Sequence, residues 1–145
     1  MKITIEDRMD GQEDEIIIRC KQMDEHLLKL VYAIKAGREK LTVTSGNDIF
    51  RVAPKDVFYF EAVDNKVFLY FEKEVYETKL KLYELEERFV GTDFLRVSKS
   101  VIMNLSKVKT LSPAFNGRFE AIMKNGEKII ISRQYVPVLK DKLGL

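Results

Sequence analysis

The segment over residues 57–80 constrains the fold most strongly, because it is built largely from residues that favour strands. It reads VFYFEAV, then the polar turn DNK, then VFLYFEKEVYETKL. Aromatic and β-branched residues dominate both runs, which is the composition of strands. Consecutive strands broken only by short polar turns predict an antiparallel meander at the centre of the fold.

Further strands and short helices are predicted on both sides of this meander. Residues 41–44 and 49–52 flank the turn SGND, and the Asn-Gly pair at 125–126 is a strong hairpin signal. Helical patterns occupy residues 79–89 and 133–143. The sequence therefore predicts an α+β fold that is mostly β, with short antiparallel sheets and short helices.

The first forty residues read as a small unit of their own. Residues 2–6 (KITIE) and 15–20 (EIIIRC) have strand patterns, and the spacing of apolar residues predicts a helix over residues 23–36. We therefore divide the chain into a strand-strand-helix unit, residues 1–40, and a main domain, residues 41–145. We expect the smaller unit to serve in dimerisation or regulation.

Charge is distributed unevenly along the chain. Residues 1–95 hold 15 Lys and Arg against 20 Asp and Glu, a net charge of −5, whereas residues 96–145 hold 10 against 3, a net charge of +7. A basic C-terminal third favours a polyanionic partner, either nucleic acid or an acidic membrane surface. A basic face that is merely solvated is the alternative.

Catalytic and metal-binding patterns are absent from the sequence. The single His26 lies in a different sequence context from any candidate Ser or Thr nucleophile, and there is no glycine-rich phosphate loop. One cysteine, Cys20, and one histidine are too few for a zinc site. We expect no enzyme activity, no cofactor, no small-molecule substrate and no membrane association. With neither a signal peptide nor an apolar span, the chain is expected in the cytoplasm.

Residues 96–111, RVSKSVIMNLSKVKTL, combine cations, hydroxyls and apolar residues without a single acid. The apolar residues repeat every two positions, like a strand, and from Val97 onward also every four, like a helix. A short helix over residues 100–104, ended by Asn104 and followed by a strand, satisfies both periods. The start of such a helix would be an anion site.

Most of the chain, roughly Leu41 to Leu145, resembles a known family. FLRVSKSVIMNLSKVKTL, followed by FNGRFEAIMKNGEKIIISRQYVPVLKDKL, is similar to the LytTR-type DNA-binding domain of bacterial transcription regulators. The residues that match the family's F-x-R-x-x-[KR]-S-x-[IVL]-V-N and S-R-x-Y motifs are Phe94, Arg96, Lys99, Ser100, Ile102, Asn104, Ser132, Arg133 and Tyr135. Glu61 and Ala62 match the Glu-Ala pair of its early strands.

The resemblance implies a LytTR-like arrangement of short sheets that reads double-stranded DNA by inserting loops into successive major grooves. With only residues 1–40 before the domain, the chain is expected to be a stand-alone member without a receiver domain, acting as a homodimer. The predicted DNA-binding residues are Asn65, Lys66, Arg96, Lys99, Ser100, Lys107, Lys109, Arg118, Ser132, Arg133 and Gln134.

Two other functions are compatible with the sequence. One is a protein interaction module that pairs with another regulator through residues 1–40 and modulates it. The other is single-stranded RNA binding, in which Phe58, Tyr59 and Phe60 would stack on bases from the sheet surface.

Overall fold

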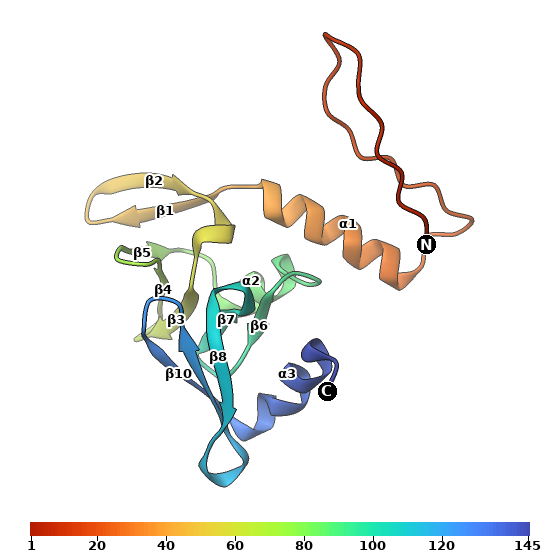
Figure 1. Cartoon of the computed structure of the whole chain (residues 1–145). Helices are drawn as coiled ribbons and strands as arrows, with labels where there is room; N and C mark the ends of the chain where they lie inside the picture. Colours follow the sequence, from red (N-terminus) through yellow and green to blue (C-terminus); the bar gives the residue numbers. More distant parts are fainter.

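The computed structural model describes residues 1–36 and 38–145, and over this part of the chain it is mostly β with three α-helices (Figure 1). The helices are α1 (Glu25–Arg38), α2 (Leu82–Arg88) and α3 (Val136–Leu143). Two antiparallel sheets form the rest of the folded part, and the N-terminal segment stands apart from them beyond α1. The predicted α+β class is confirmed.

The larger sheet has seven strands among the described residues, in the order β2-β1-β5-β4-β3-β7-β6. The strands are β1 (Leu41–Ser45), β2 (Asp48–Val52), β3 (Tyr59–Val63), β4 (Lys66–Tyr70), β5 (Val75–Thr78), β6 (Phe94–Arg96) and β7 (Val101–Asn104). Strands β3, β4 and β5 lie side by side in chain order, which confirms the meander predicted from the sequence.

The turn between β3 and β4 fixes the register of this meander. Asp64 and Asn65 both have positive φ, 51° and 65°, as the type I′ hairpin turn requires. Asp and Asn tolerate this conformation better than other residues with a Cβ, so the sequence suits the turn. The resulting register places Phe60 opposite Leu69, and both side chains are fully buried.

The smaller sheet has three strands in the order β10-β9-β8 and carries α3. Its strands are β8 (Val108–Pro113), β9 (Phe119–Met123) and β10 (Lys128–Ile131). The Asn125-Gly126 pair lies in the turn between β9 and β10, so this predicted hairpin is confirmed. Four short 3-10 turns complete the fold over the residues that the structure describes: η1 (Pro54–Asp56), η2 (Leu105–Lys107), η3 (Phe115–Gly117) and η4 (Arg133–Tyr135).

Strand β7 contributes to two hydrophobic cores at once. Ile102 packs with Phe60, Leu85 and other residues beneath α2, whereas its neighbour Met103 packs with Ile131 and other residues beneath α3. Successive side chains of a strand point to opposite faces, so one strand can serve both cores. The two sheets are therefore joined through this part of the larger sheet.

The helix predicted over residues 100–104 is wrong, because this segment is the strand β7. Hydrogen-bonded neighbours on both sides, β3 and β6, fix it in an extended conformation. The alternation of its apolar residues therefore describes the structure, and the four-residue repeat from Val97 is coincidental. The following strand begins at Val108 rather than Ser106, because η2 intervenes.

Asn104 does not end a helix, contrary to the prediction, but lies in extended backbone at φ −88° and ψ 106°. Its buried side chain joins three segments. The amide Nδ2 donates to the carbonyl of Val57 at 2.7 Å, and Oδ1 accepts from the backbone N–H of Ser106 at 3.1 Å and from its hydroxyl at 2.7 Å. Asn104 thus holds the end of β7 that lies away from Ser100.

Helix α1 confirms the N-terminal helix prediction, displaced by two residues from the predicted range 23–36. The Asp24 side chain caps it by accepting from the N–H of Leu27 at 2.9 Å. At its other end Glu39 forms an ion pair with Arg88 of α2 at 3.3 Å. The helix is thereby attached to the domain.

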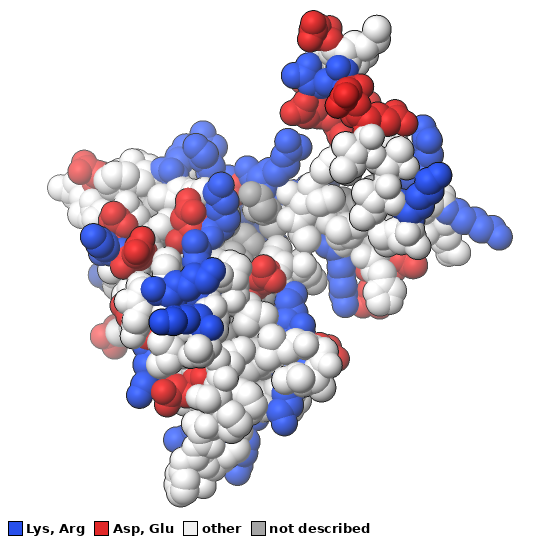
Figure 2. All heavy atoms as spheres, in the orientation of Figure 1, with Lys and Arg blue, Asp and Glu red and all other residues white. Residues whose placement is uncertain are grey.

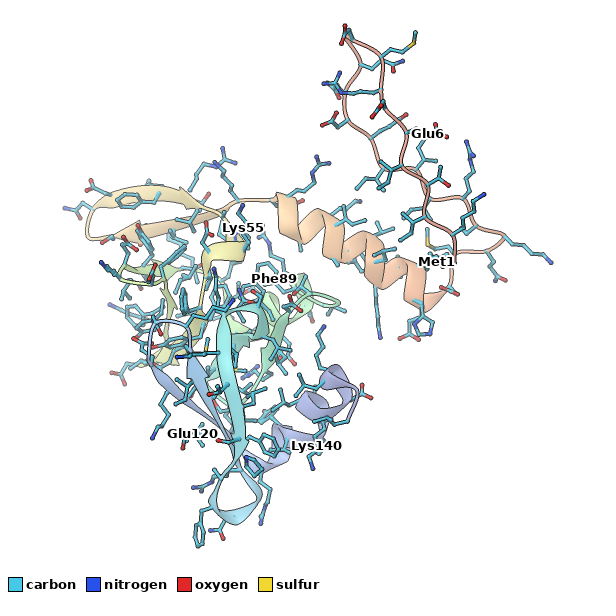
Figure 3. The ribbon with its side chains drawn as sticks, in the orientation of Figure 1. Met1, Glu6, Lys55, Phe89, Glu120 and Lys140 are labelled. Carbon is cyan, nitrogen blue, oxygen red and sulfur yellow. The ribbon has the colours of Figure 1, made fainter. Side chains whose placement is uncertain are left out.

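The two strands predicted at residues 2–6 and 15–20 do not form, since residues 1–24 contain no strand in the structure. The segments instead run as two exposed limbs joined by a turn at Asp10 and Gly11 (Figure 1). Two isolated strands are at best marginally stable in water, and no sheet lies beside these limbs to bury their isoleucines. Figure 3 shows the limbs, with Glu6 labelled, standing clear of the sheets.

Candidate nucleic-acid interface

Backbone hydrogen bonds bring three loops together at one end of the domain. The N–H of Ala62, just before the β3–β4 turn, donates to the carbonyl of Ser100 at 2.8 Å. The N–H of Ser132, just after β10, donates to the carbonyl of Val97 at 2.9 Å. The segment from Val97 to Ser100 therefore lies between the other two loops, although the three are far apart in sequence.

A fourth loop joins them through a close side-chain contact. Gly117 has φ 72°, and a Cβ at this position would stand 3.1 Å from Cδ and 3.2 Å from Cγ of Arg133. The aliphatic stem of Arg133 thus lies over the glycine. We call the four loops, residues 64–66, 97–100, 115–118 and 132–134, the loop end of the domain.

Six of the predicted DNA-binding residues lie exposed in these loops. They are Asn65, Lys66, Lys99, Arg118, Arg133 and Gln134. Ser100 and Ser132 are half-buried in the same loops, where their backbone groups make the connections described above. The structure therefore gathers eight of the eleven predicted residues at one end.

Arg96 is placed differently from this exposed set, because its guanidinium is already engaged within the protein. Nε donates to the carbonyl of Ser98 at 2.8 Å, one terminal nitrogen donates to the carbonyl of Lys99, and the other forms an ion pair with Glu86 of α2 at 2.8 Å. The side chain is 20% exposed. Arg96 thus fixes the backbone of the loop that presents Lys99.

Lys107 and Lys109 lie outside the loop end. Lys107 follows β7 at the end away from Ser100, and its Nζ stands 5.4 Å from the centroid of the Phe58 ring. Its carbonyl accepts from the N–H of Lys124 at 2.9 Å. These three lysines form a second basic group near the start of β8. Figure 2 shows Lys and Arg side chains gathered near the middle of the visible face of the domain.

Sequence reasoning missed two features of the loop end. The close packing of Gly117 against Arg133 joins residues that are distant in sequence, so no local pattern indicates it. Phe115, at the start of η3, is 82% exposed although it is a large apolar residue. The sequence FNGR contained a signal for a tight turn, which would place this aromatic residue at a loop tip.

Two tyrosines lie close to carboxylates near the junction of the sheets. Tyr59 and Tyr70 stack at 4.3 Å between ring centroids, and the hydroxyl of Tyr70 donates to Glu61 at 3.3 Å. Burial raises the pKa of the Tyr59 hydroxyl well above its ordinary value, and a hydrogen bond to Glu127 raises the pKa further. Burial and the neighbouring Glu61 also raise the pKa of Tyr70. Both tyrosines stay protonated and able to donate at neutral pH.

The three aromatic residues that were expected to stack on RNA bases are not exposed on the sheet surface. Phe58 and Phe60 are buried in the two separate cores, and Tyr59 is half-buried against Tyr70. Single-stranded bases would need exposed ring faces on the sheet. These three residues do not provide them.

Comparison with known proteins gives the family of this fold. The family model described as the LytTr DNA-binding domain matches residues 47–144. The chain belongs to this family. A solved LytTr DNA-binding domain, from a DNA response regulator of Bacillus cereus, superposes with a TM-score of 0.71 at 28% identity, covering 75% of this chain and 100% of that one.

Several relatives of different length are similar to this chain. The sensory transduction protein LytT of Bacillus subtilis is 31% identical over 88% of this chain and 53% of its own length. The LytT protein of Enterococcus faecalis is 30% identical over 74% of this chain and 44% of its own length. The chain thus spans about half of these relatives. An HTH-type transcriptional regulator of Staphylococcus aureus is 25% identical over 100% of this chain and 99% of its own.

The family is one of DNA-binding domains and not of enzymes. Among the residues that the structure describes, no helix is both long enough and apolar enough to cross a bilayer.

Proposed function

We propose that this protein is a sequence-specific, double-stranded DNA-binding transcription regulator. The observation that carries the proposal is the convergence of loops at one end of a LytTr domain, with Lys66, Lys99, Arg118 and Arg133 exposed there. Lysine and arginine bind phosphates, and an arginine held by its stem can reach a guanine edge in the major groove. The loops enter successive major grooves, and the protein acts as a dimer on paired half-sites.

Within this proposal the residues of the loop end have different roles. Arg133 reads a base, because Gly117 lies against its stem and η4 fixes its backbone. Asn65 and Lys66, on the rigid β3–β4 turn, contact a neighbouring groove. Lys99 contacts a base edge or a phosphate, and Ser100 and Gln134 add polar contacts beside it. Ser132 orients its loop through the backbone.

Three of the predicted residues take supporting roles. Arg96 positions the loop that carries Lys99 instead of contacting DNA itself, since the ion pair with Glu86 and two backbone carbonyls occupy its guanidinium. Lys107 and Lys109, in the second basic group, contact phosphates that flank the recognised bases. Such contacts add affinity for any sequence but no base preference.

The proposal is tested by selecting bound duplexes from a random pool with the full chain. An enriched motif is expected, and an unenriched pool would refute sequence-specific reading. On the selected duplex, Arg133→Ala is expected to cost about 1–3 kcal/mol and to relax the preference at one base position. The matched control is Arg51→Ala, because Arg51 is an exposed arginine on β2, at the opposite edge of the larger sheet.

Salt dependence distinguishes phosphate contacts from base contacts. Each phosphate contact contributes about −0.9 to the slope of log K against log salt for duplex DNA. Lys107→Ala is expected to weaken binding to all duplexes alike and to reduce the slope by about this amount. A change in motif preference on removing Lys107 would contradict its assignment to the phosphates.

A further inference from the structure

The two N-terminal limbs expose an unusual amount of aliphatic surface for segments that make no sheet. Ile3 is 82% exposed and Ile5 is 91% exposed on the first limb, and Ile16 and Ile17 are 62% and 63% exposed on the second. Extended segments rich in β-branched residues favour pairing with another strand, and an unpaired backbone edge is a template for it. The limbs therefore need a partner that the single copy does not supply.

Beyond the ion pair between Arg8 and Asp14 beside the turn, the charges of the limbs oppose their pairing within one chain. The turn at Asp10 and Gly11, closed by the N–H of Gln12 donating to the carbonyl of Met9 at 3.3 Å, fixes which residues would be opposite one another. Continuing this register places Glu6 opposite Glu15 and Lys2 opposite Arg19. Like charges directly opposite each other destabilise a strand pair.

The same charges favour pairing between two copies of the chain. In an antiparallel pair centred on Ile17, Glu15 lies opposite Arg19 of the second copy, and Glu13 lies opposite Lys21 of the second copy. Two-fold symmetry repeats both contacts, so the nine-residue segment EDEIIIRCK is complementary to itself. Opposite charges and β-branched residues facing each other both stabilise such a pair.

We propose that residues 13–21 pair antiparallel with residues 13–21 of a second copy and that this strand pair forms the dimer interface. The interface is isologous, as a two-fold dimer requires, and Ile17 lies on the symmetry axis. The inference rests on the proposed function in one respect: the dimer it describes is the one that places two loop ends on paired half-sites.

Dimerisation also offsets the charge repulsion that opposes pairing between the two limbs of one chain. The first limb of each copy can then add outside the central pair, because Arg19 of the second copy lies beside Glu15 and offsets its repulsion of Glu6. In this four-stranded sheet Ile3, Ile5, Ile16 and Ile18 of both copies share one face. Leu28 and Tyr32, one turn apart on α1 and 40% and 49% exposed, are available to cover that face.

Charge reversal tests the interface on the full chain by light scattering after size exclusion, without DNA. The wild type is expected to be a dimer, and Arg19→Glu a monomer, because it sets Glu15 opposite a new carboxylate. The double change Glu15→Arg with Arg19→Glu restores opposite charges and is expected to restore the dimer. A monomeric wild type, an undiminished Arg19→Glu dimer or an unrestored double variant would each overturn the interface.

Cysteine cross-linking tests the register. In the background Cys20→Ser, a cysteine replacing Ile17 would face its own copy at a Cα separation of about 4.5–5.5 Å, which permits a disulfide. Ile16→Cys in the same background is the matched control, since its two copies would be about 8 Å apart, beyond disulfide reach. Oxidation is expected to link the first variant and not the second. The reverse result, or equal linking, would refute the register.

Measurements of DNA binding distinguish a failure of this dimer interface from a failure of the proposed function. The monomeric Arg19→Glu variant is expected to bind a duplex with one half-site within about twofold of the wild type, and to lose tenfold or more on paired half-sites. Equal binding of both proteins to paired half-sites would show that the limbs do not form the DNA-bound dimer. If dimerisation and cross-linking behave as expected but no duplex is selected, the interface stands and the proposed function fails.

Discussion

Replacing Arg96 by alanine tests how the loop end is built. Its guanidinium donates to the carbonyls of Ser98 and Lys99 and forms an ion pair with Glu86, so the 97–100 loop and α2 lose a common partner. None of these contacts is to DNA in our proposal. The change should therefore loosen the loop that presents Lys99 and leave the number of phosphate contacts unchanged.

The size of the effect follows from these contacts. Two hydrogen bonds from a largely buried side chain contribute on the order of 1 kcal/mol each. The ion pair adds less than about 1 kcal/mol, because the Glu86 side chain is 51% exposed and its charge is screened by water. If the variant must supply the free energy of these lost contacts, about 2 kcal/mol, when it binds DNA, its affinity for DNA falls by roughly thirtyfold.

The assay is fluorescence anisotropy on the selected duplex over a range of salt concentrations. Arg96→Ala is expected to weaken binding with an unchanged salt slope, whereas Lys99→Ala, if Lys99 contacts a phosphate, lowers the slope by about 0.9. Glu86→Gln should also weaken binding, although it removes a negative charge near DNA. A reduced slope for Arg96→Ala, or tighter binding for Glu86→Gln, would show that Arg96 contacts the DNA directly.

Three further changes have outcomes that the structure specifies. Asn104→Leu should lower the free energy of unfolding by about 2–4 kcal/mol in urea, because the buried backbone groups served by its amide lose their partners. Gly117→Ala should displace Arg133 and so weaken specific DNA binding about tenfold, equivalent to about 1.4 kcal/mol. The control is Gly46→Ala, which should leave DNA binding unchanged, because Gly46 also has positive φ but a Cβ there would meet nothing within 4 Å. The raised pKa of Tyr59 means that the folded state keeps a proton that the unfolded state loses above pH about 10. Stability should therefore be full below that pH and fall above it, and Tyr59→Phe should make the fall shallower in alkaline denaturation; an unchanged fall would contradict this origin.

Local patterns were sufficient where a segment is stabilised by its own neighbours in sequence. The β3–β5 meander, the hairpin at Asn125-Gly126 and the three helices follow from strand-favouring residues, turn residues and helical spacing. These signals act over a few residues, so the sequence contains all of the information that they need.

The segment that became β7 shows where local patterns fail. Its apolar residues fit both a strand and a helix, and the choice was made by strands β3 and β6, which flank it. The same holds for the role of Arg96, which depends on Glu86 of α2, and for the contact between Gly117 and Arg133. A cationic side chain in a motif can bind phosphate or hold a loop, and only its tertiary partners distinguish the two.

The shared strand β7 has a consequence for how the domain unfolds. Since Ile102 and Met103 anchor different cores, neither core can lose its packing without exposing the strand that completes the other. The region should therefore open as one cooperative unit, and amide hydrogens of β3 and β9 should exchange with the same free energy. Two sheets that look separate in outline would then have a single melting transition.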